Sequence, residues 1–182
     1  MSIPFDLNEA ISILEKTPKA LIAQLSGLSE KWLHSNEGEN SWSPIQILGH
    51  LVHGEETDWL PRAKIILSSE SSKEFEPYDR FAQEKIYADK NGKELLTMFE
   101  KKRNSNIKEL KKLTITEKEL SLKGIHPEFG EIRLKEMLSS WVVHDLGHIA
   151  QINRVLAKNY SDEIGPWKKY LTIVRSKPAV EE

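Results

Sequence analysis

Four long segments of this sequence carry apolar residues at the spacing of an amphipathic helix, and this rhythm constrains the fold more than any other feature. The segments span about residues 7–25, 43–67, 95–113 and 133–159. Apolar residues that recur every three or four positions fall on one face of a helix, and few stretches alternate with the period of a strand. Helices of this kind bury their apolar faces against one another. The sequence therefore predicts an all-α protein, a four-helix bundle with short extra helices.

Prolines and glycines set the expected limits of these helices. Thr17-Pro18 and Ser43-Pro44 each resemble an N-cap followed by a proline in the first helical position. The first segment should therefore break near Thr17, and the second should begin at Ser43. Pro61 should kink the second segment, because a proline removes one backbone hydrogen bond from a helix.

The connections hold shorter elements. A short element is expected over residues 81–87, and residues 117–130 read as a loop with a small hairpin around 125–133. After Gly165-Pro166, a short terminal helix should cover residues 167–174. The third segment has basic residues mostly off its apolar stripe, which with interleaved glutamates indicates a solvated face: Lys101, Lys102, Arg103, Lys108, Lys111 and Lys112.

Composition narrows the class of protein further. The 182 residues fit one domain over 1–182, and 38% hydrophobic with 30% charged residues leaves no stretch that fits a membrane span. The net charge of −2 gives no general attraction to nucleic acid. There is no cysteine, so a metal would need His, Asp or Glu ligands. The N-terminus has no basic and apolar leader, which favours a cytoplasmic protein.

Two histidines, His144 and His148, lie four residues apart in the last long segment. Four residues bring the second ring to within about 40° of the first, one turn along the same face. With Met137, Trp141 and Gln151 they follow the alternating steps of an inward-facing seam. An unpaired buried polar group costs about 1–3 kcal/mol, and metal ligation would remove that cost. A hydrogen-bonded core pair or an exposed pair would also fit the spacing.

A metal site needs a third ligand, and His50 in the second segment is the best candidate. It has apolar neighbours, and a glycine one turn later leaves space beside its ring: Ile47, Leu51 and Gly54. His53 lies about 60° from His50 on the other side. It is an alternative ligand, a base that acts beside the metal or in catalysis, or an exposed residue. His34 and His126 fall in expected loops, where a functional role is not needed, although the loop at His126 could overhang the site.

Several familiar catalytic patterns are absent from the sequence. Glu55, Glu56 and Asp58 make no Glu-x-x-His pairing of the di-iron type. The run from His144 to His148 has Asp145 where a zinc protease would have glutamate. Glycine-rich phosphate loops and the Gly-x-Ser-x-Gly pattern of serine hydrolases are also missing.

Two separated motifs carry a family resemblance. They are Trp42-Ser43-Pro44 followed by Leu48-Gly49-His50-Leu51, and the run WVVHDLGHIAQI over residues 141–152. Together they resemble the DinB-like superfamily over about residues 6–174. The resemblance implies a four-helix bundle, frequent homodimers and one divalent metal held by three histidines, which carry over as His50, His144 and His148. Members include thiol-dependent S-transferases and isomerases, metal-dependent hydrolases and proteins without an assigned activity, so the resemblance implies no particular substrate.

Three neutral imidazoles would leave a divalent ion with its full charge and an open position, as in catalytic sites. Such an ion activates water or an external low-molecular-weight thiol, so we expect a hydrolase or an S-transferase that acts on a small molecule. Zinc and nickel are the favoured metals, although three nitrogen ligands also suit iron or copper. His53 is the first candidate for handling the proton, ahead of Glu55 and Asp58. The alternative is a non-catalytic metal-binding or stress-response bundle.

The tryptophans give one expectation about assembly. Trp32, Trp59 and Trp167 offer more aromatic surface than one small bundle covers. Together with the habit of the family, this predicts a homodimer.

Overall fold

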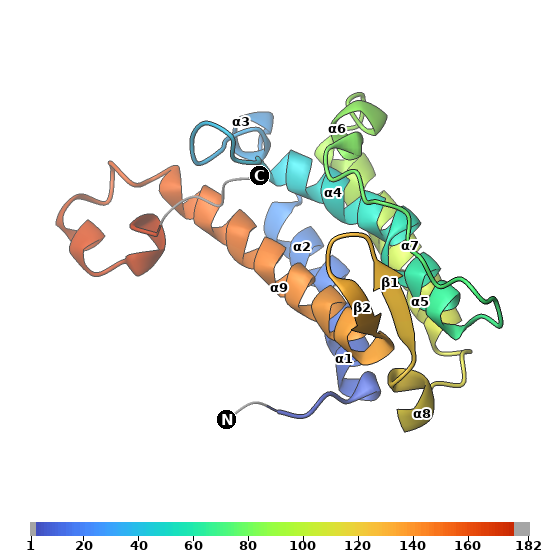
Figure 1. The fold of residues 1–182 in the computed structure, drawn as a ribbon. Coiled ribbons are helices and arrows are strands. Elements are labelled where there is room, and N and C mark those ends of the chain that lie inside the picture. The colour runs from blue at the N-terminus through green and yellow to red at the C-terminus, as the bar shows by residue number, and fades with distance from the viewer. Residues whose placement is uncertain (1–2, 177–182) are drawn as a thin grey trace.

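The computed structural model describes residues 3–176 and shows four long helical segments packed side by side, with short elements between them (Figure 1). The first segment consists of α1 (Leu7–Leu14) and α2 (Thr17–Leu25), and the second of α4 (Pro44–Thr57) and α5 (Trp59–Leu67). The third is α7 (Gly92–Leu110) and the fourth is α9 (Leu134–Lys158). The predicted all-α four-helix fold is confirmed.

The two interrupted segments break for local reasons. α2 begins at Thr17 with Pro18 in its first turn, but the N-cap is Lys16 rather than Thr17. α4 ends at Thr57 and α5 begins at Trp59, so the break falls three residues before Pro61, at Asp58. Pro61 has no N–H to donate to the carbonyl of Thr57, and its ring would clash with that carbonyl. The chain therefore starts a new helix whose first turn tolerates the proline.

Capping interactions fix where α4 and α7 begin. Ser43 N donates to Gln46 Oε1 over 3.0 Å, which forms part of a capping box before Pro44. Asn91 N donates to Glu94 Oε2 and Glu94 N donates to Asn91 Oδ1, each over 3.0 Å. These side chains satisfy backbone donors that have no partner within the helix.

The shorter elements lie at the ends and on one side of the bundle. They are α3 (Glu30–Leu33), α6 (Ala82–Ile86), α8 (Glu117–Leu120), η1 (Gly165–Lys169) and η2 (Thr172–Val174). The terminal helix expected over residues 167–174 is thus two 3-10 turns. No helix in residues 3–176 is long and apolar enough to cross a membrane.

A β-hairpin leads into α9. Its strands β1 (Lys123–His126) and β2 (Gly130–Arg133) pair antiparallel, with Lys123 opposite Arg133 and His126 opposite Gly130. Gly130 has a φ of +69°, which suits a glycine after a three-residue turn. A Cβ on Gly124 would lie 2.6 Å from Phe75 Cζ, so only glycine lets the hairpin pack this closely against the crossover before α6. The hairpin thereby closes one side of the bundle near α5.

Two clusters of buried apolar residues form the core, one toward each end of the bundle. The first joins α1, α5, the end of α7 and the start of α9. The second joins α2, α4, the start of α7 and Ile152 on α9. The buried polar residues Thr17, Glu55, Arg103 and Asp145 lie between the two clusters along their helices.

The tryptophans have different surroundings from those expected. Trp59 is buried and stacks on Trp141, with ring centres 5.9 Å apart. Trp32 packs on Tyr160 at 5.0 Å, and Trp167 is 66% exposed. The prediction that Trp59 offers surface for an interface is therefore wrong, because the bundle core itself covers this side chain.

Candidate metal centre

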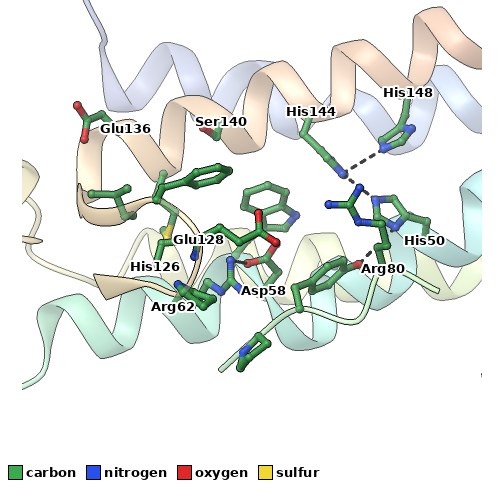
Figure 2. A pocket seen from close by; sticks show the side chains of 18 of the residues that line it. His50, Asp58, Arg62, Arg80, His126, Glu128, Glu136, Ser140, His144 and His148 are labelled. Carbon is green, nitrogen blue, oxygen red and sulfur yellow. Dashed lines mark hydrogen bonds and ion pairs between the residues drawn. The ribbon is translucent and has the colours of Figure 1, made fainter. Parts of the chain in front are cut away.

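Three histidines from two helices converge in the middle of the bundle. His50 extends from α4, and His144 and His148 extend from consecutive turns of α9 (Figure 2). Nε2 of His144 lies 2.9 Å from Nε2 of His50 and 3.1 Å from Nε2 of His148. One ligand atom from each residue lies within 4.8 Å of the others. His50, His144 and His148, the three metal ligands expected from the sequence, therefore lie together, and their binding of a metal stays a prediction.

The outer nitrogens of His148 and His50 have hydrogen-bond partners, whereas that of His144 makes no hydrogen bond and faces a carboxylate. His148 Nδ1 donates to Gln151 Oε1 over 2.8 Å, so its hydrogen is on Nδ1 and the lone pair is on Nε2. His144 Nδ1 lies 3.9 Å from Asp145 Oδ1, and His50 Nδ1 lies 3.4 Å from the Tyr78 hydroxyl. Histidines that bind metals almost always use their second nitrogen in this way.

The arrangement of these nitrogens fits a cation. The Asp145 carboxylate favours a hydrogen on Nδ1 of His144, which leaves a lone pair on Nε2 opposite that of His148. Two lone pairs at 3.1 Å repel each other unless a positive charge lies between them. Two nitrogen ligands at about 2.0–2.1 Å from one zinc ion would themselves be about 3–4 Å apart. The donor set and its spacing therefore fit one divalent metal ion.

Burial keeps two of these rings neutral. Burial, together with the neighbouring His148 and His144, lowers the pKa of His50 to about 2. Burial and His144 also lower the pKa of His148 to about 4. Neutral imidazoles have the free lone pair that a metal ligand requires, so these two ligands are ready at neutral pH.

The histidines lie in the wall of a pocket with a volume of about 510 Å³. It runs along α9 toward the β-hairpin, as Figure 2 shows from His148 to Glu136. Its walls combine aromatic rings with charged groups; the residues include Trp42, Asp58, Trp59, Arg62, Tyr78, Arg80, His126, Glu128, Phe129 and Met137. Such a pocket can hold a small molecule beside the histidines.

The sequence matches the family model of the DinB superfamily over residues 13–152. This is well over half of the chain. The chain belongs to the DinB superfamily. No protein with a curated function matches it significantly.

Two solved structures share the four-helix fold of this chain. YfiT from Bacillus subtilis is described as "a probable metal-dependent hydrolase with an unusual four-helix bundle topology". It matches with a TM-score of 0.71 and 19% identity, over 91% of this chain and 93% of YfiT. TT2238, described as a four-helix bundle protein, matches with a TM-score of 0.54 and 21% identity, over 80% and 97% of the two chains. At these identities the likeness concerns the fold alone.

The other candidates from the sequence have separate locations in this DinB protein. His53 is buried, and its ring packs against Tyr78 with centres 5.3 Å apart; it is not among the residues that line the pocket. Its catalytic role stays a prediction. Glu55 is buried in an ion pair with Arg103, whereas Asp58 lines the pocket and contacts Arg62 at 2.8 Å.

Two more expectations concern the surroundings of the site. His126 ends β1 and lines the pocket, stacked on Phe129 at 4.4 Å, so the loop does overhang the site. His34 pairs with Glu30 on the surface, away from the three histidines. The space expected beside Gly54 is filled by Trp59, because a Cβ there would lie 3.2 Å from the indole nitrogen.

Sequence reasoning missed Arg103, which was assigned to the solvated face of the third segment. The structure buries it completely. Its guanidinium makes ion pairs with Glu55 at 2.7 Å and with Asp145 at 2.6 Å. The spacing did contain a signal, because Arg103 is four residues from both Phe99 and Ile107 and so lies on the apolar stripe.

Proposed function

We propose that this member of the DinB superfamily is a metal-dependent hydrolase that acts on a small molecule, with His50, His144 and His148 as the ligands of one divalent ion. The observation that carries the proposal is the convergence of three Nε2 atoms on the wall of a pocket, with each Nδ1 near a neighbouring polar group. The metal is zinc or nickel, since both suit three nitrogen ligands.

An open coordination position favours catalysis over a purely structural metal. The cluster within residues 3–176 brings together three ligand residues and no fourth. Asp58, a possible fourth ligand, is instead paired with Arg62. Structural zinc sites use four protein ligands, whereas catalytic sites leave a position for water or substrate. The adjacent pocket gives a substrate room to reach that position.

The neighbouring side chains pack around the ligand rings. Tyr78 and Gln151 contact the outer nitrogens of His50 and His148, and the Asp145 carboxylate lies 3.9 Å from the outer nitrogen of His144. Trp42 packs on His50 with ring centres 4.8 Å apart, and Trp59 packs on His144 at 5.0 Å. A divalent cation held there would lower the pKa of a water molecule toward neutrality.

Asp58 is the group that we assign to receive the proton, at Oδ2, because Oδ1 pairs with Arg62. Burial raises the pKa of the Asp58 carboxyl above its usual range, although Arg62 pulls it the other way. A carboxylate with a raised pKa is a better proton acceptor. Asp58 lines the pocket, and His53, which was the first candidate, is buried behind Tyr78.

An external thiol in place of water would make the same site an S-transferase. The chain has no cysteine, so the sulfur would come with the substrate. We favour water because a protein with the same fold, YfiT, is described as a probable metal-dependent hydrolase.

Elemental analysis of protein purified without a His-tag tests the proposal. We expect one equivalent of a divalent metal per chain, and hydrolysis of small esters, amides or phosphate esters once that metal is restored. His144→Ala should lose both the metal and the turnover. Full activity of His144→Ala on a substrate of the wild type would exclude the mechanism. Turnover only in the presence of an added thiol would identify the S-transferase instead.

A further inference from the structure

A buried cluster of charged side chains lies next to the three histidines. Arg103 from α7 contacts Glu55 from α4 and Asp145 from α9, and none of these side chains is exposed. Asp145 follows His144 directly, and its Oδ1 lies 3.9 Å from His144 Nδ1. The cluster therefore connects α7, which supplies no metal ligand, to the proposed ligand His144 on α9.

Every donor of the Arg103 guanidinium is used. Nε and one hydrogen of NH2 donate to Glu55 Oε1, over 3.0 and 2.7 Å. NH2 and NH1 donate to the two oxygens of Asp145 over 3.1 and 2.6 Å, and NH1 also donates to the carbonyl of Leu14 over 2.9 Å. A planar group with five satisfied donors has one orientation. Arg103 therefore fixes Asp145 relative to α1, α4 and α7.

Glu55 faces donors on both of its oxygens. Its Oε1 accepts from Trp141 Nε1 over 3.1 Å as well as from Arg103, and its Oε2 accepts from Asn106 Nδ2 over 3.0 Å. Burial raises the pKa of the Glu55 carboxyl, but the four N–H donors directed at its two oxygens favour the carboxylate. Both oxygens of Asp145 accept hydrogen bonds from the Arg103 guanidinium, over 3.1 and 2.6 Å, which is the geometry of a carboxylate paired with arginine. Two carboxylates and one guanidinium leave the cluster with one negative charge.

We propose that Glu55, Arg103 and Asp145 form an anionic support for the metal centre, in which Asp145 is a positioning residue for His144 and the net negative charge strengthens binding of a divalent cation. The inference rests on the proposed metal site. An unbalanced charge in the protein interior acts over longer distances than one in water, because the interior screens it weakly. The same carboxylate orients the His144 ring with Nε2 toward the other two histidines, as outer carboxylates do in other metal sites.

The test measures the affinity of the full-length apo protein for Zn²⁺, by competition with a chromophoric chelator. Asp145→Asn keeps the shape of the side chain and removes the net charge of the cluster. We expect it to weaken Zn²⁺ binding at least tenfold, the usual effect of losing an outer carboxylate. We also expect the absorption spectrum of bound Co²⁺ to change, because His144 loses its orienting partner.

Glu37→Gln is the matched control. Glu37 is also a carboxylate with a fully covered side chain, and it pairs with Arg154 and Lys158 on α9. It is not part of the cluster, so its loss should leave Zn²⁺ affinity within twofold of the wild type. If Asp145→Asn does not fold, Glu55→Gln removes the same charge from α4 and should weaken binding at least threefold.

The outcomes separate this inference from the proposed function. A wild type that binds no Zn²⁺, Ni²⁺ or other divalent ion overturns both. A wild type that binds tightly, with a folded Asp145→Asn less than threefold weaker, overturns the support role alone. An equal loss in Glu37→Gln also overturns it, because the effect would then follow from any missing buried carboxylate.

Discussion

At the scale of single residues, the neighbours of a histidine decide what its ring can bind. His148 has its hydrogen fixed on Nδ1 by Gln151, so Nε2 can act only as an acceptor. His53 is three residues from His50 in the sequence but packs its ring on Tyr78 outside the pocket wall. His50 and His53 lie on one helix but point about 60° apart, so only His50 faces the pocket and the other two histidines.

Asp58→Asn should separate catalysis from metal binding. The variant keeps the size of the side chain but cannot accept a proton, so we expect the metal content to stay at one equivalent and kcat to fall at least tenfold. Metal analysis and steady-state kinetics on the substrate found by screening check this. His53→Ala is the comparison, since the sequence favoured that residue. If His53→Ala loses the rate while Asp58→Asn keeps it, His53 handles the proton.

The sequence predicted the three histidines but not Arg103, and the reason is physical. The spacing of His144 and His148 is local, because four residues along a helix fix their relative direction. Arg103 is buried only because Glu55 and Asp145 meet it from two other helices. An arginine is almost never fully buried without such partners, and the partners are 48 and 42 residues away in the chain.

At the scale of elements, local chemistry fixed most boundaries. The capping box at Ser43 and the proline after it made the start of α4 predictable. The sequence predicted a kink from Pro61, and the structure has a break at Asp58, because the proline acts on the carbonyl four residues earlier. Asp58 owes its place at the pocket to this break, which ends α4 one turn after Gly54.

The loop before α4 is tied to α9 by Glu37, and this tie should depend on pH. Arg154 and Lys158 hold the pKa of Glu37 below its ordinary value, even though burial opposes this. The ionised carboxylate therefore stabilises the fold above the unfolded pKa of about 4.3, and the stabilisation disappears as the pH falls through the lower folded pKa.

Glu37→Gln should therefore lower the free energy of unfolding by about 1–2 kcal/mol at pH 7. The difference from the wild type should shrink below about pH 4. Urea titrations at pH 7, 5 and 3.5 measure it. A difference that stays constant over this range would show that the ion pairs do not contribute to stability.

At the scale of the whole molecule, a polar layer crosses the bundle between its two apolar clusters. Thr17, Glu55, Arg103 and Asp145 lie at this level, one from each of the four long segments. Thr17 also makes a side-chain hydrogen bond with Asp145, which explains why a polar residue is buried at the break between α1 and α2. The periodicity of each helix predicted a bundle, but a layer of this kind depends on how the four helices are aligned, which no single segment encodes.

We propose a homodimer whose interface includes Trp167 but not Trp59, because Trp59 is buried in the bundle. Trp167 and Tyr170 in η1 and its C-cap are 66% and 74% exposed. On the outer face of α9, Val143 is 66% exposed and Leu146 is 48% exposed. Burying apolar surface of this kind against a second copy of the chain is favourable by about 25 cal/mol per Å². Sedimentation equilibrium should show a dimer at micromolar concentration, and Trp167→Ser should weaken it; a monomeric wild type would contradict the proposal.

Binding of a metal should stabilise the whole fold, because the proposed ligands come from two helices far apart in the sequence. His50 on α4 and His144 and His148 on α9 can hold one ion only while the two helices are docked. A ligand that binds the folded state alone adds about 2.7 kcal/mol at a concentration 100 times its Kd. For a chain of this size that corresponds to about 5–10 °C in Tm. Scanning calorimetry of the apo protein with and without Zn²⁺ measures the shift, and a chelator should reverse it.

His144→Ala should show almost no shift, since two ligands hold an ion much more weakly than three. An equal shift in this variant would mean that Zn²⁺ binds elsewhere on the molecule, and the three-histidine site would then have no part in stability.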